Sequence, residues 1–317
     1  MSLRVAVQMD PLEKINISGD STFALMLKAQ QLGHKLFHYL AEDLTYDGGR
    51  LYAGAHEVTV QAVAGDHYRL GEFAILDLGK DVDVVLMRQD PPFDLGYITA
   101  THLLERIQGE TLVVNDPAAV RDAPEKVWVL DFAQYMPPTM VTRSIGAARH
   151  FLEEHGEIVL KPLHGNAGKA VFKISRDSAN LAALMELFNV TYREPHVLQL
   201  FLPEVADGDK RIILVDGEVA GGINRRPAKG DIRSNLAAGG TAEASELTET
   251  EREICAALSP ELKRRGLLFV GIDVIGGKWL TEINVTSPTG IVPLDKFNGT
   301  DTAGLIWSAI ERRLTAR

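Results

Sequence analysis

The stretch from residue 270 to residue 290 constrains the fold most, because it reads as two strands joined by a tight turn. Apolar and β-branched residues fill 270–275 and 280–285, and Gly276-Gly277 between them is a hairpin-turn signal. The two strands are therefore predicted to pair antiparallel. Side chains two residues apart on a strand point to the same face, so Glu282 and Asn284 share one. Asp273, on the partner strand, reaches that face if the register matches.

These three oxygen-bearing side chains lie inside otherwise apolar strands. A charged residue in such a position needs a partner, a ligand or a metal to offset its desolvation. Two carboxylates and an amide, with no His or Cys beside them, suit a small octahedral cation that completes its shell with water and phosphate oxygens. The alternative is that Asp273 and Glu282 are solvated strand-end charges and Asn284 is a turn residue. Taken together, the three indicate a Mg²⁺-nucleotide site and disfavour zinc.

Composition limits the classes of protein that remain. With 317 residues, 45% hydrophobic and 24% charged, the chain is typical of a globular protein, and its length suggests roughly two or three domains. A net charge of −10 argues against general nucleic-acid binding, since phosphate contacts need a basic face. No stretch is long enough to cross a bilayer, and residues 1–10 read as a strand rather than a signal peptide. We therefore expect no membrane partner and a cytoplasmic location, which the single cysteine, Cys255, also fits as a buried small apolar residue.

The first part of the chain alternates strands and helices, which predicts an open α/β domain over residues 1–120. We expect strands at 3–9, 35–40, 82–87 and 111–114, an added hairpin at 51–53 and 57–63, and helices at 21–32 and 98–107. A turn at Asn115-Asp116-Pro117 marks the boundary.

Two further parts are predicted, over 121–198 and 199–317. The second should hold helices at 118–132 and 145–155 and strands at 139–142, 157–162 and 170–174. The third should hold strands at 196–202, 211–215 and 218–222 and a helix at 251–265, with Asp216-Gly217 as a hairpin turn.

The loop 163–169 contains Gly165, Gly168 and Lys169, and its backbone N–H groups could hold phosphates. It is not a Walker A motif, because a glycine is missing five residues before Gly168 and no Ser or Thr follows Lys169. An ordinary hairpin turn is the alternative. Lys161 before the loop and Lys126 on the preceding helix favour a phosphate site, although solvent exposure would also explain either lysine.

A second loop, over 225–240, combines arginines with small residues. Arg225, Arg226 and Arg233 precede the segment 235–240, which is rich in Ala and Gly. This pattern indicates a lid that brings cations onto an anionic substrate, with a solvated loop as the alternative.

The order of these features resembles the ATP-grasp superfamily and, within it, the bacterial glutathione synthetase family. The stretches that carry the resemblance span nearly the whole chain: 14–17, 19–24, 87–94, 209–211, 233–240, 271–276 and 280–290. The resemblance implies an α/β fold in which an N-terminal open domain (1–120) precedes a two-lobed ATP-grasp fold of α+β character. Its small lobe (121–198) would carry the phosphate loop, and its C-terminal lobe (199–317) the metal site and the lid.

The same resemblance implies roles for individual residues. ATP would be bound by Lys126, Lys161, Gly165, Asn166, Gly168, Gln199, Leu200, Phe201, Leu202 and Asp209. Mg²⁺ or Mn²⁺ would be held by Asp273, Glu282 and Asn284, and the acyl-phosphate and peptide site would hold Arg211, Arg226, Arg233 and Asn235. Further substrate contacts would come from Asn16, Asp20, Ser21, Arg88, Ser287 and Thr289. The chain departs from the family at 164–169, where an acidic first residue and more glycine are usual.

The implied activity is ATP-dependent ligation of γ-glutamylcysteine and glycine to glutathione through an acyl phosphate, with release of ADP and phosphate. The implied partners are small-molecule substrates and further copies of the chain, as a homotetramer. Two alternatives stay open on the residues alone. One is another ATP-grasp ligase, such as a D-alanine–D-alanine or glutamate-adding enzyme, and the other is a non-catalytic ATP-binding regulatory protein.

Overall fold

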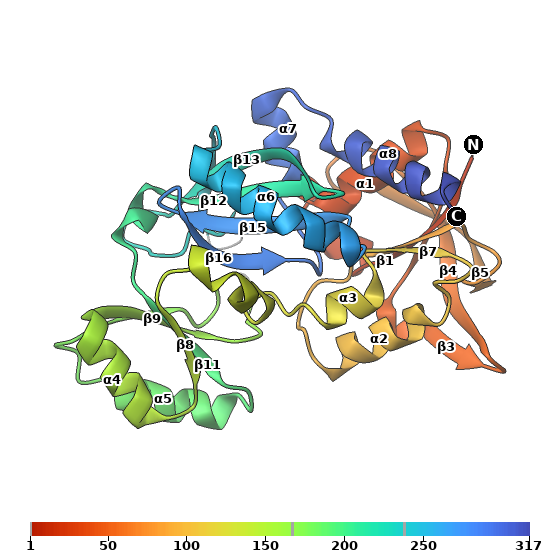
Figure 1. Cartoon of the computed structure of the whole chain (residues 1–317). Helices are drawn as coiled ribbons and strands as arrows, with labels where there is room; N and C mark the ends of the chain where they lie inside the picture. Colours follow the sequence, from red (N-terminus) through yellow and green to blue (C-terminus); the bar gives the residue numbers. More distant parts are fainter. Residues whose placement is uncertain (1, 166–167, 237–238) are drawn as a thin grey trace.

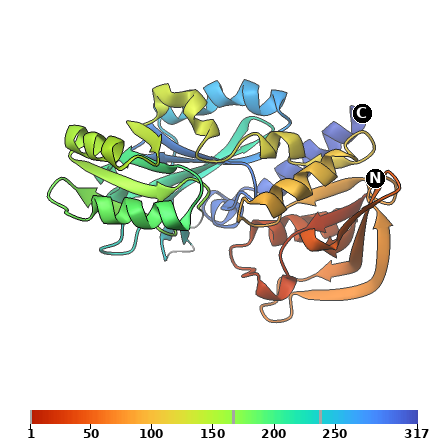
Figure 2. The ribbon, with the colours of Figure 1, turned by 90° about the horizontal axis from the view of Figure 1, so that it is seen from below.

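Three β-sheets, each built from one continuous stretch of chain, organise the molecule (Figure 1). The computed structural model describes residues 2–165, 168–236 and 239–317. The N-terminal sheet lies at one end of the molecule and the four-stranded sheet at the other, with the five-stranded sheet between them (Figure 2). No helix of the described residues combines the length and apolar character needed to cross a membrane.

The N-terminal sheet has the strand order β3-β4-β2-β1-β6-β7, with β5 paired to β4. Its strands are β1 (Arg4–Gln8), β2 (Lys35–Tyr39), β3 (Leu44–Asp47), β4 (Arg50–Val60), β5 (Tyr68–Asp77), β6 (Val84–Met87) and β7 (Leu112–Val114). Strands β2, β1, β6 and β7 run parallel, which confirms the predicted β-α-β opening. Short 3₁₀ helices η1 (Leu12–Lys14) and η2 (Ala41–Asp43) follow β1 and β2.

Helices cover both faces of this sheet. Because side chains alternate along a strand, Val5 and Val7 pack in one core with helices from the two ends of the chain, and Ala6 in the other core. These helices are α1 (Ser21–Gln31) and α8 (Thr302–Thr315) on the first face and α2 (Leu95–Glu105) and α3 (Pro117–Arg121) on the second.

The four-stranded sheet is antiparallel, in the order β10-β9-β11-β8. Its strands are β8 (Thr139–Thr142), β9 (Glu157–Pro162), β10 (Phe172–Ser175) and β11 (His196–Leu200). Helices α4 (Ile145–His155) and α5 (Leu181–Thr191) share its apolar core. The helix at 145–155 and the strand at 157–162 have the predicted bounds.

The five-stranded sheet follows the order β14-β13-β12-β15-β16, and its four strand pairs are antiparallel. Its strands are β12 (Asp209–Val215), β13 (Glu218–Arg226), β14 (Thr241–Ala244), β15 (Phe269–Ile275) and β16 (Trp279–Asn284). The associated helices are η3 (Trp128–Tyr135), η4 (Pro203–Asp207), α6 (Glu249–Arg264) and α7 (Ile291–Asn298). The predicted hairpin at 270–285 is confirmed, and Asp273 is the register partner of Glu282. Cys255 is buried in α6, as expected.

The structure corrects two of the predicted elements. The hairpin expected at 51–53 and 57–63 is one continuous strand, β4, whose hairpin partner is the unpredicted β5. Gly54 serves there for close packing rather than for a turn, since a Cβ at this position would lie 3.2 Å from the Phe73 ring. Elements α5, α7, α8 and β14 were also not predicted.

The second correction concerns the helix expected at 118–132. It is divided into α3 and η3, separated by residues 122–127. Pro124 explains the break, because proline lacks the N–H of a helix interior and disfavours helical geometry in the residue before it. Lys126 therefore lies in a connecting segment and not on a helix.

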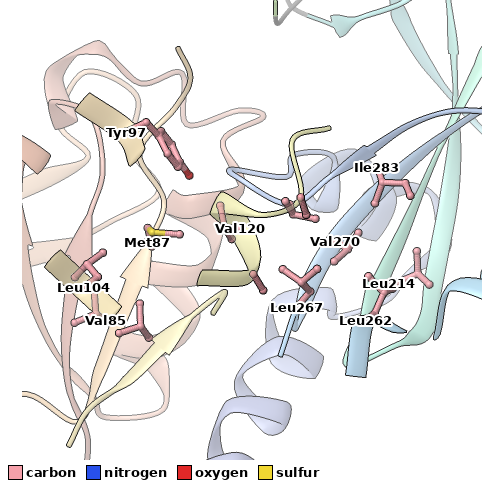
Figure 3. Close-up of a cluster of buried hydrophobic side chains, with 14 of the residues drawn as sticks. Val85, Met87, Tyr97, Leu104, Val120, Leu214, Leu262, Leu267, Val270 and Ile283 are labelled. Atoms are coloured by element: carbon pink, nitrogen blue, oxygen red, sulfur yellow. The ribbon is translucent and has the colours of Figure 1, made fainter. Parts of the chain in front are cut away.

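One apolar cluster joins the N-terminal sheet to the five-stranded sheet (Figure 3). It runs from Met87 and Tyr97 through Val120 to Leu214 and Val270. Asn115, directly after β7, reinforces this contact because its side chain donates to the carbonyls of Phe269 and Val285.

Candidate functional site

A cavity of about 120 Å³ lies between the four-stranded and five-stranded sheets. Most of the residues expected to bind ATP line it: Lys126, Lys161, Gly165, Gly168, Gln199, Leu200, Phe201, Leu202 and Asp209. Asn166 lies outside the described residues. Lys169, Arg233, Asn235, Asp273 and Glu282 also line the cavity, so cations and carboxylates converge there.

Two lysines in this cavity face one carboxylate. Lys161 Nζ lies 3.5 Å from Glu282 Oε1, and Lys126 Nζ lies 3.6 Å from the same oxygen. Burial lowers the pKa of Lys161, against the attraction of Glu282. For Glu282, burial raises the pKa, but the two lysines outweigh it and hold the pKa below its ordinary value. A pair of desolvated ammonium groups is suited to phosphate oxygens.

Lys161 is also held by polar contacts within its own sheet. Gln199 on β11 accepts a hydrogen bond from Lys161 Nζ at 3.3 Å and donates one to Thr139 Oγ1 at 2.9 Å. This chain of contacts fixes the direction of the ammonium group. Lys126 is anchored separately, because its ammonium group donates to the carbonyl of Gly165 in the phosphate loop.

A second cavity, of about 210 Å³, adjoins the first. Glu282 and Asn235 line both cavities, so they stand between them. The second cavity is lined by Asp90, Pro91, Glu125, Arg211, Ile223, Arg225, Asn235, Leu236, Glu282, Asn284, Thr286, Ser287, Thr289 and Gly290. It therefore brings the tail of the 270–290 stretch against the 90–91 segment of the N-terminal part.

The register of the five-stranded sheet assembles a buried cluster of four charges. Arg211 lies opposite Asp273, and Asp209 lies opposite Arg225, so each pair shares a face. Arg211 Nε donates to Asp273 Oδ1 at 2.5 Å, and its Nη2 donates to Oδ2 at 3.0 Å. Arg225 Nη2 lies 2.7 Å from Asp209 Oδ2 and 3.0 Å from Asp273 Oδ1. Each arginine thus holds a defined direction toward Asp273.

The protonation of this cluster follows from its contacts. Burial raises the pKa of Asp273, but Arg211 and Arg225 outweigh it and hold the pKa well below the usual range. For Asp209 the balance is reversed, since burial raises its pKa above the ordinary value despite Arg225. Of the two carboxylates, Asp273 therefore stays ionised more readily than Asp209.

The expected metal ligands are adjacent and offer oxygen. Asp273 and Glu282 are register partners, and Asn284 is paired with Gly271 two positions away on the same strands. Asn284 Nδ2 lies 3.5 Å from Asp273 Oδ2, so the amide and carboxylate are in contact. A set of two carboxylates and one amide oxygen fits a magnesium or manganese ion.

The N-terminal substrate residues take different positions. Arg88 is buried, donates to Thr22 Oγ1 at 3.0 Å and to the Pro288 carbonyl at 2.8 Å, and has Nη1 without a partner among the described residues. Ser21 accepts a hydrogen bond from the Gly290 N–H at 3.1 Å. Both side chains therefore secure the segment that forms the floor of the second cavity.

The four other residues expected to contact the substrate lie in two places: two line the second cavity, and two lie near the start of α1. Ser287 and Thr289 line the second cavity. Asp20 caps α1 by accepting from the Phe23 N–H, and Asn16 accepts from Ser18, so neither of these two lines it. Of the six expected substrate residues, only Ser287 and Thr289 line the second cavity, and Asn16, Asp20, Ser21 and Arg88 do not.

Arg226 lies away from both cavities. It is exposed and pairs with Glu243, with Nε 3.0 Å from Oε1. Because side chains alternate along β13, its neighbour Arg225 points inward and lines the second cavity. The structure therefore does not bring Arg226 to either cavity, whereas Arg225, which was expected in the lid, lines the second. Only the register of β13, which cannot be read from the sequence, decides which of the two arginines points inward.

Sequence reasoning assigned no role to Glu125, although this residue lines the second cavity. Glu125 and Thr286 line the second cavity, and Thr286 Oγ1 donates to Glu125 Oε1 at 2.8 Å. Burial raises the pKa of Glu125, with Lys126 opposing the rise and Glu282 adding to it. Pro124 was the available signal, since a break there frees Glu125 from the expected helix.

Two solved structures match nearly the whole chain at low sequence identity. A D-cycloserine synthetase, DcsG, matches with a TM-score of 0.69 and 19% identity, covering 98% of this chain and 99% of that chain. The ATP-grasp ligase PsnB, solved with its precursor peptide and AMPPNP, matches with a TM-score of 0.61 and 17% identity, covering 98% of both. These similarities show the ATP-grasp fold.

Sequence comparisons are more specific. Residues 3–121 match the prokaryotic glutathione synthetase N-terminal domain, and residues 125–299 match the prokaryotic glutathione synthetase ATP-grasp domain. A glutathione synthetase of Rhodopseudomonas palustris is 56% identical over 313 residues, covering 99% of each chain. One from Shewanella oneidensis is 42% identical over 314 residues, covering 98% of this chain and 99% of its own. The chain therefore belongs to the prokaryotic glutathione synthetase family.

Proposed function

We infer that the protein is an ATP-dependent ligase that joins γ-glutamylcysteine and glycine to form glutathione. The observation that carries this function is the high identity to glutathione synthetases over nearly the full chain, together with both family domains. The adjoining cavities, with Glu282 and Asn235 common to both, support the proposal that ATP and a second substrate bind next to each other.

The reaction must first activate a carboxylate, because hydroxide is a poor leaving group. Transfer of the ATP γ-phosphoryl group to the dipeptide carboxylate gives an acyl phosphate and ADP. The glycine nitrogen then attacks the acyl carbon, the C–O bond to phosphate breaks, and phosphate leaves with the electron pair. Lys126 and Lys161 hold the ATP phosphates in this proposal, which positions the γ-phosphoryl group at the boundary between the cavities.

Arg211 and Arg225 are the proposed cations at the reacting carbonyl. Each is already directed by a buried carboxylate, so neither needs to reorganise as negative charge develops on the oxygen. A well-placed donor of this kind contributes about 3 kcal/mol in other acyl-transfer sites. Arg233 and Asn235 belong to the proposed lid over 225–240, which would exclude water that otherwise hydrolyses the acyl phosphate.

Asp273, Glu282 and Asn284 are the proposed ligands for Mg²⁺ or Mn²⁺. When bound, the ion offsets the charge of phosphate oxygens during transfer. Replacing Glu282 by Gln removes one anionic ligand with little change in shape. We expect turnover at saturating Mg²⁺ to fall at least about tenfold, in line with the loss of a metal-site contact. Direct titration of Mn²⁺ binding by electron paramagnetic resonance gives a second readout, and unchanged Mn²⁺ affinity in Glu282→Gln would remove this residue from the metal site.

One assay tests the function itself. ADP release is measured with ATP and Mg²⁺ in the presence of γ-glutamylcysteine plus glycine, of D-alanine, or of no acceptor pair, and the product is identified by mass spectrometry. We expect ADP release to require the first pair and to match glutathione formed. Release that is independent of this pair, or that follows D-alanine, would overturn the proposal.

We also propose that the protein forms a homo-oligomer, as the family resemblance implies, and that it is located in the cytoplasm. Strand β5 supports an assembled state, since Phe73 and Ile75 on it are 56% and 71% exposed. Neighbouring exposed apolar side chains of this kind mark protein interfaces. Light scattering of the purified protein should give a multiple of the 34.7 kDa chain mass. Phe73→Lys with Ile75→Lys should lower that mass, and a monomeric parent protein would contradict the proposal.

A further inference from the structure

Three carboxylates line the second cavity: Asp90, which is exposed, Glu125 and Glu282. Glu282, in the same cavity, faces Lys126 and Lys161. Glu125 forms no ion pair with any residue that the structure describes, and its only recorded side-chain hydrogen bond within those residues is from the neutral hydroxyl of Thr286, at 2.8 Å to Oε1. Its second oxygen, Oε2, forms no side-chain hydrogen bond within those residues. A carboxylate in this position is suited to a cationic group brought by a ligand.

The backbone of Glu125 is fixed to the metal-site hairpin. Its carbonyl accepts a hydrogen bond from the Ile283 N–H at 3.2 Å, between the two metal-site residues of β16. The hydroxyl of Thr286, a residue that is 4% exposed, donates a hydrogen bond to Glu125 Oε1. The carboxylate therefore has a defined position in the cavity that also contains Arg211 and Arg225.

The second substrate of the proposed reaction supplies such a cation. The amino group of an amino acid is largely protonated at neutral pH, and an ammonium nitrogen has no lone pair for attack on a carbonyl. One proton must leave before the C–N bond forms, and a second must leave as the amide is completed. The leaving phosphate can take one of these protons, so the protein needs to receive only the other.

We propose that Glu125 binds the ammonium group of the acceptor amino acid and accepts one of its protons as the C–N bond forms. The acyl phosphate dianion and the ammonium form give the amide, hydrogen phosphate and one proton, which passes from Glu125 to water. Charge and atoms balance in this step without any further reactant. The inference rests on the proposed ligase function and gives the acceptor amine a specific partner.

Hydroxylamine separates this role from a structural one. It is a strong nucleophile that is mostly neutral at neutral pH, so it attacks an acyl phosphate without needing a base, and it gives a coloured hydroxamate with Fe³⁺. Glu125→Gln keeps an oxygen to accept from Thr286 and removes the negative charge. We expect its glycine-dependent kcat/KM to fall by about 100-fold or more, the usual range for loss of a general base. Its hydroxamate formation should fall far less, by about threefold at most.

Two controls make the comparison specific. Glu186→Gln, an exposed residue of α5, should leave both activities at the parent level. Glu125→Asp keeps the carboxylate and should recover part of the glycine turnover that Glu125→Gln loses. It also serves as the test variant if Glu125→Gln does not fold, as judged by thermal unfolding.

The outcomes are distinct. Equal loss with glycine and hydroxylamine would show that Glu125 supports the site structurally, and glycine turnover within about threefold of the parent would show that another group takes the proton. Either result, or an Asp variant no better than Gln, overturns the inference. If the parent protein makes neither glutathione nor hydroxamate, the proposed function fails, whatever the variants do.

Discussion

At the scale of single residues, strand register decides which charges meet. Arg211 and Asp273 are cross-strand neighbours, as are Asp209 and Arg225, so the site contains two buried pairs. The pairs are linked because Arg225 also lies 3.0 Å from Asp273. The pairs are buried, and removing one partner leaves an uncompensated charge. Adjacent positions on β13 point to opposite faces of the sheet, since Arg226 faces solvent while Arg225 is 4% exposed.

We predict a large difference between these two arginines. Arg225→Ala should destabilise the fold by about 3–5 kcal/mol, the range for breaking a buried ion pair, and abolish most turnover. Arg226→Ala should leave both stability and turnover close to the parent, because its partner Glu243 is exposed as well. Urea unfolding and steady-state kinetics on the two variants measure this. Equal effects at the two positions would show that the inward and outward assignments are wrong.

At the scale of elements, local sequence signals predict helix ends better than they predict breaks. Helix α6 was expected at 251–265 and runs over Glu249–Arg264. A capping box explains its start, since Thr248 Oγ1 accepts from the Glu251 N–H at 3.1 Å and Glu251 accepts from the Thr248 N–H at 2.7 Å. Pro124 divides an expected helix and so places Glu125 and Lys126 in the site.

The end of α6 gives a pH-dependent prediction. Hydrogen bonds from Arg264 and Arg265 lower the pKa of Glu261 to about 2. Since its pKa is lower folded than unfolded, Glu261 stabilises the fold fully above its ordinary pKa of about 4.3. This contribution is lost as the pH falls toward about 2. Glu261 is partly exposed, so the contribution should be only about 0.5–1 kcal/mol.

Glu261→Gln tests this element. Its unfolding free energy should be lower than the parent's at about pH 6, and the difference should shrink below about pH 4. Urea titrations at several pH values measure the difference, with Glu253→Gln, exposed on the same helix, as the control. A difference that stays constant as the pH falls would exclude the ionic contribution.

At the scale of the whole molecule, hydrogen bonds of the Asn115 side chain tie the N-terminal sheet to the five-stranded sheet. Its Nδ2 donates to the carbonyls of Phe269 at 2.7 Å and Val285 at 2.8 Å, and its Oδ1 accepts from the Phe269 N–H at 2.8 Å. Asn115 is 4% exposed, so water cannot take its place as the hydrogen-bond partner of these backbone groups. Asn115 therefore fixes the β15-β16 hairpin relative to the first sheet.

Asn115→Ala should destabilise the protein by about 3 kcal/mol or more, because it leaves several buried backbone groups without partners. It should also lower turnover, since the segment after Asn284 forms the floor of the second cavity. Calorimetry and steady-state kinetics measure both effects. Asn180→Ala, at an exposed position before α5, is the control and should change neither. A stable variant with normal turnover would show that the apolar cluster alone fixes the two sheets.

The sequence by itself determined the strands and helices whose periodicity is strong, such as 145–155, 157–162 and the hairpin at 270–285. It also grouped Asp273, Glu282 and Asn284, because two-residue alternation and a glycine turn are local properties. It could not determine that 50–60 is one strand, that Arg225 rather than Arg226 points inward, or that Glu125 lines a cavity. Those features depend on cross-strand register and on contacts between distant segments, such as Ile283 with Glu125, and only the packed tertiary structure sets these.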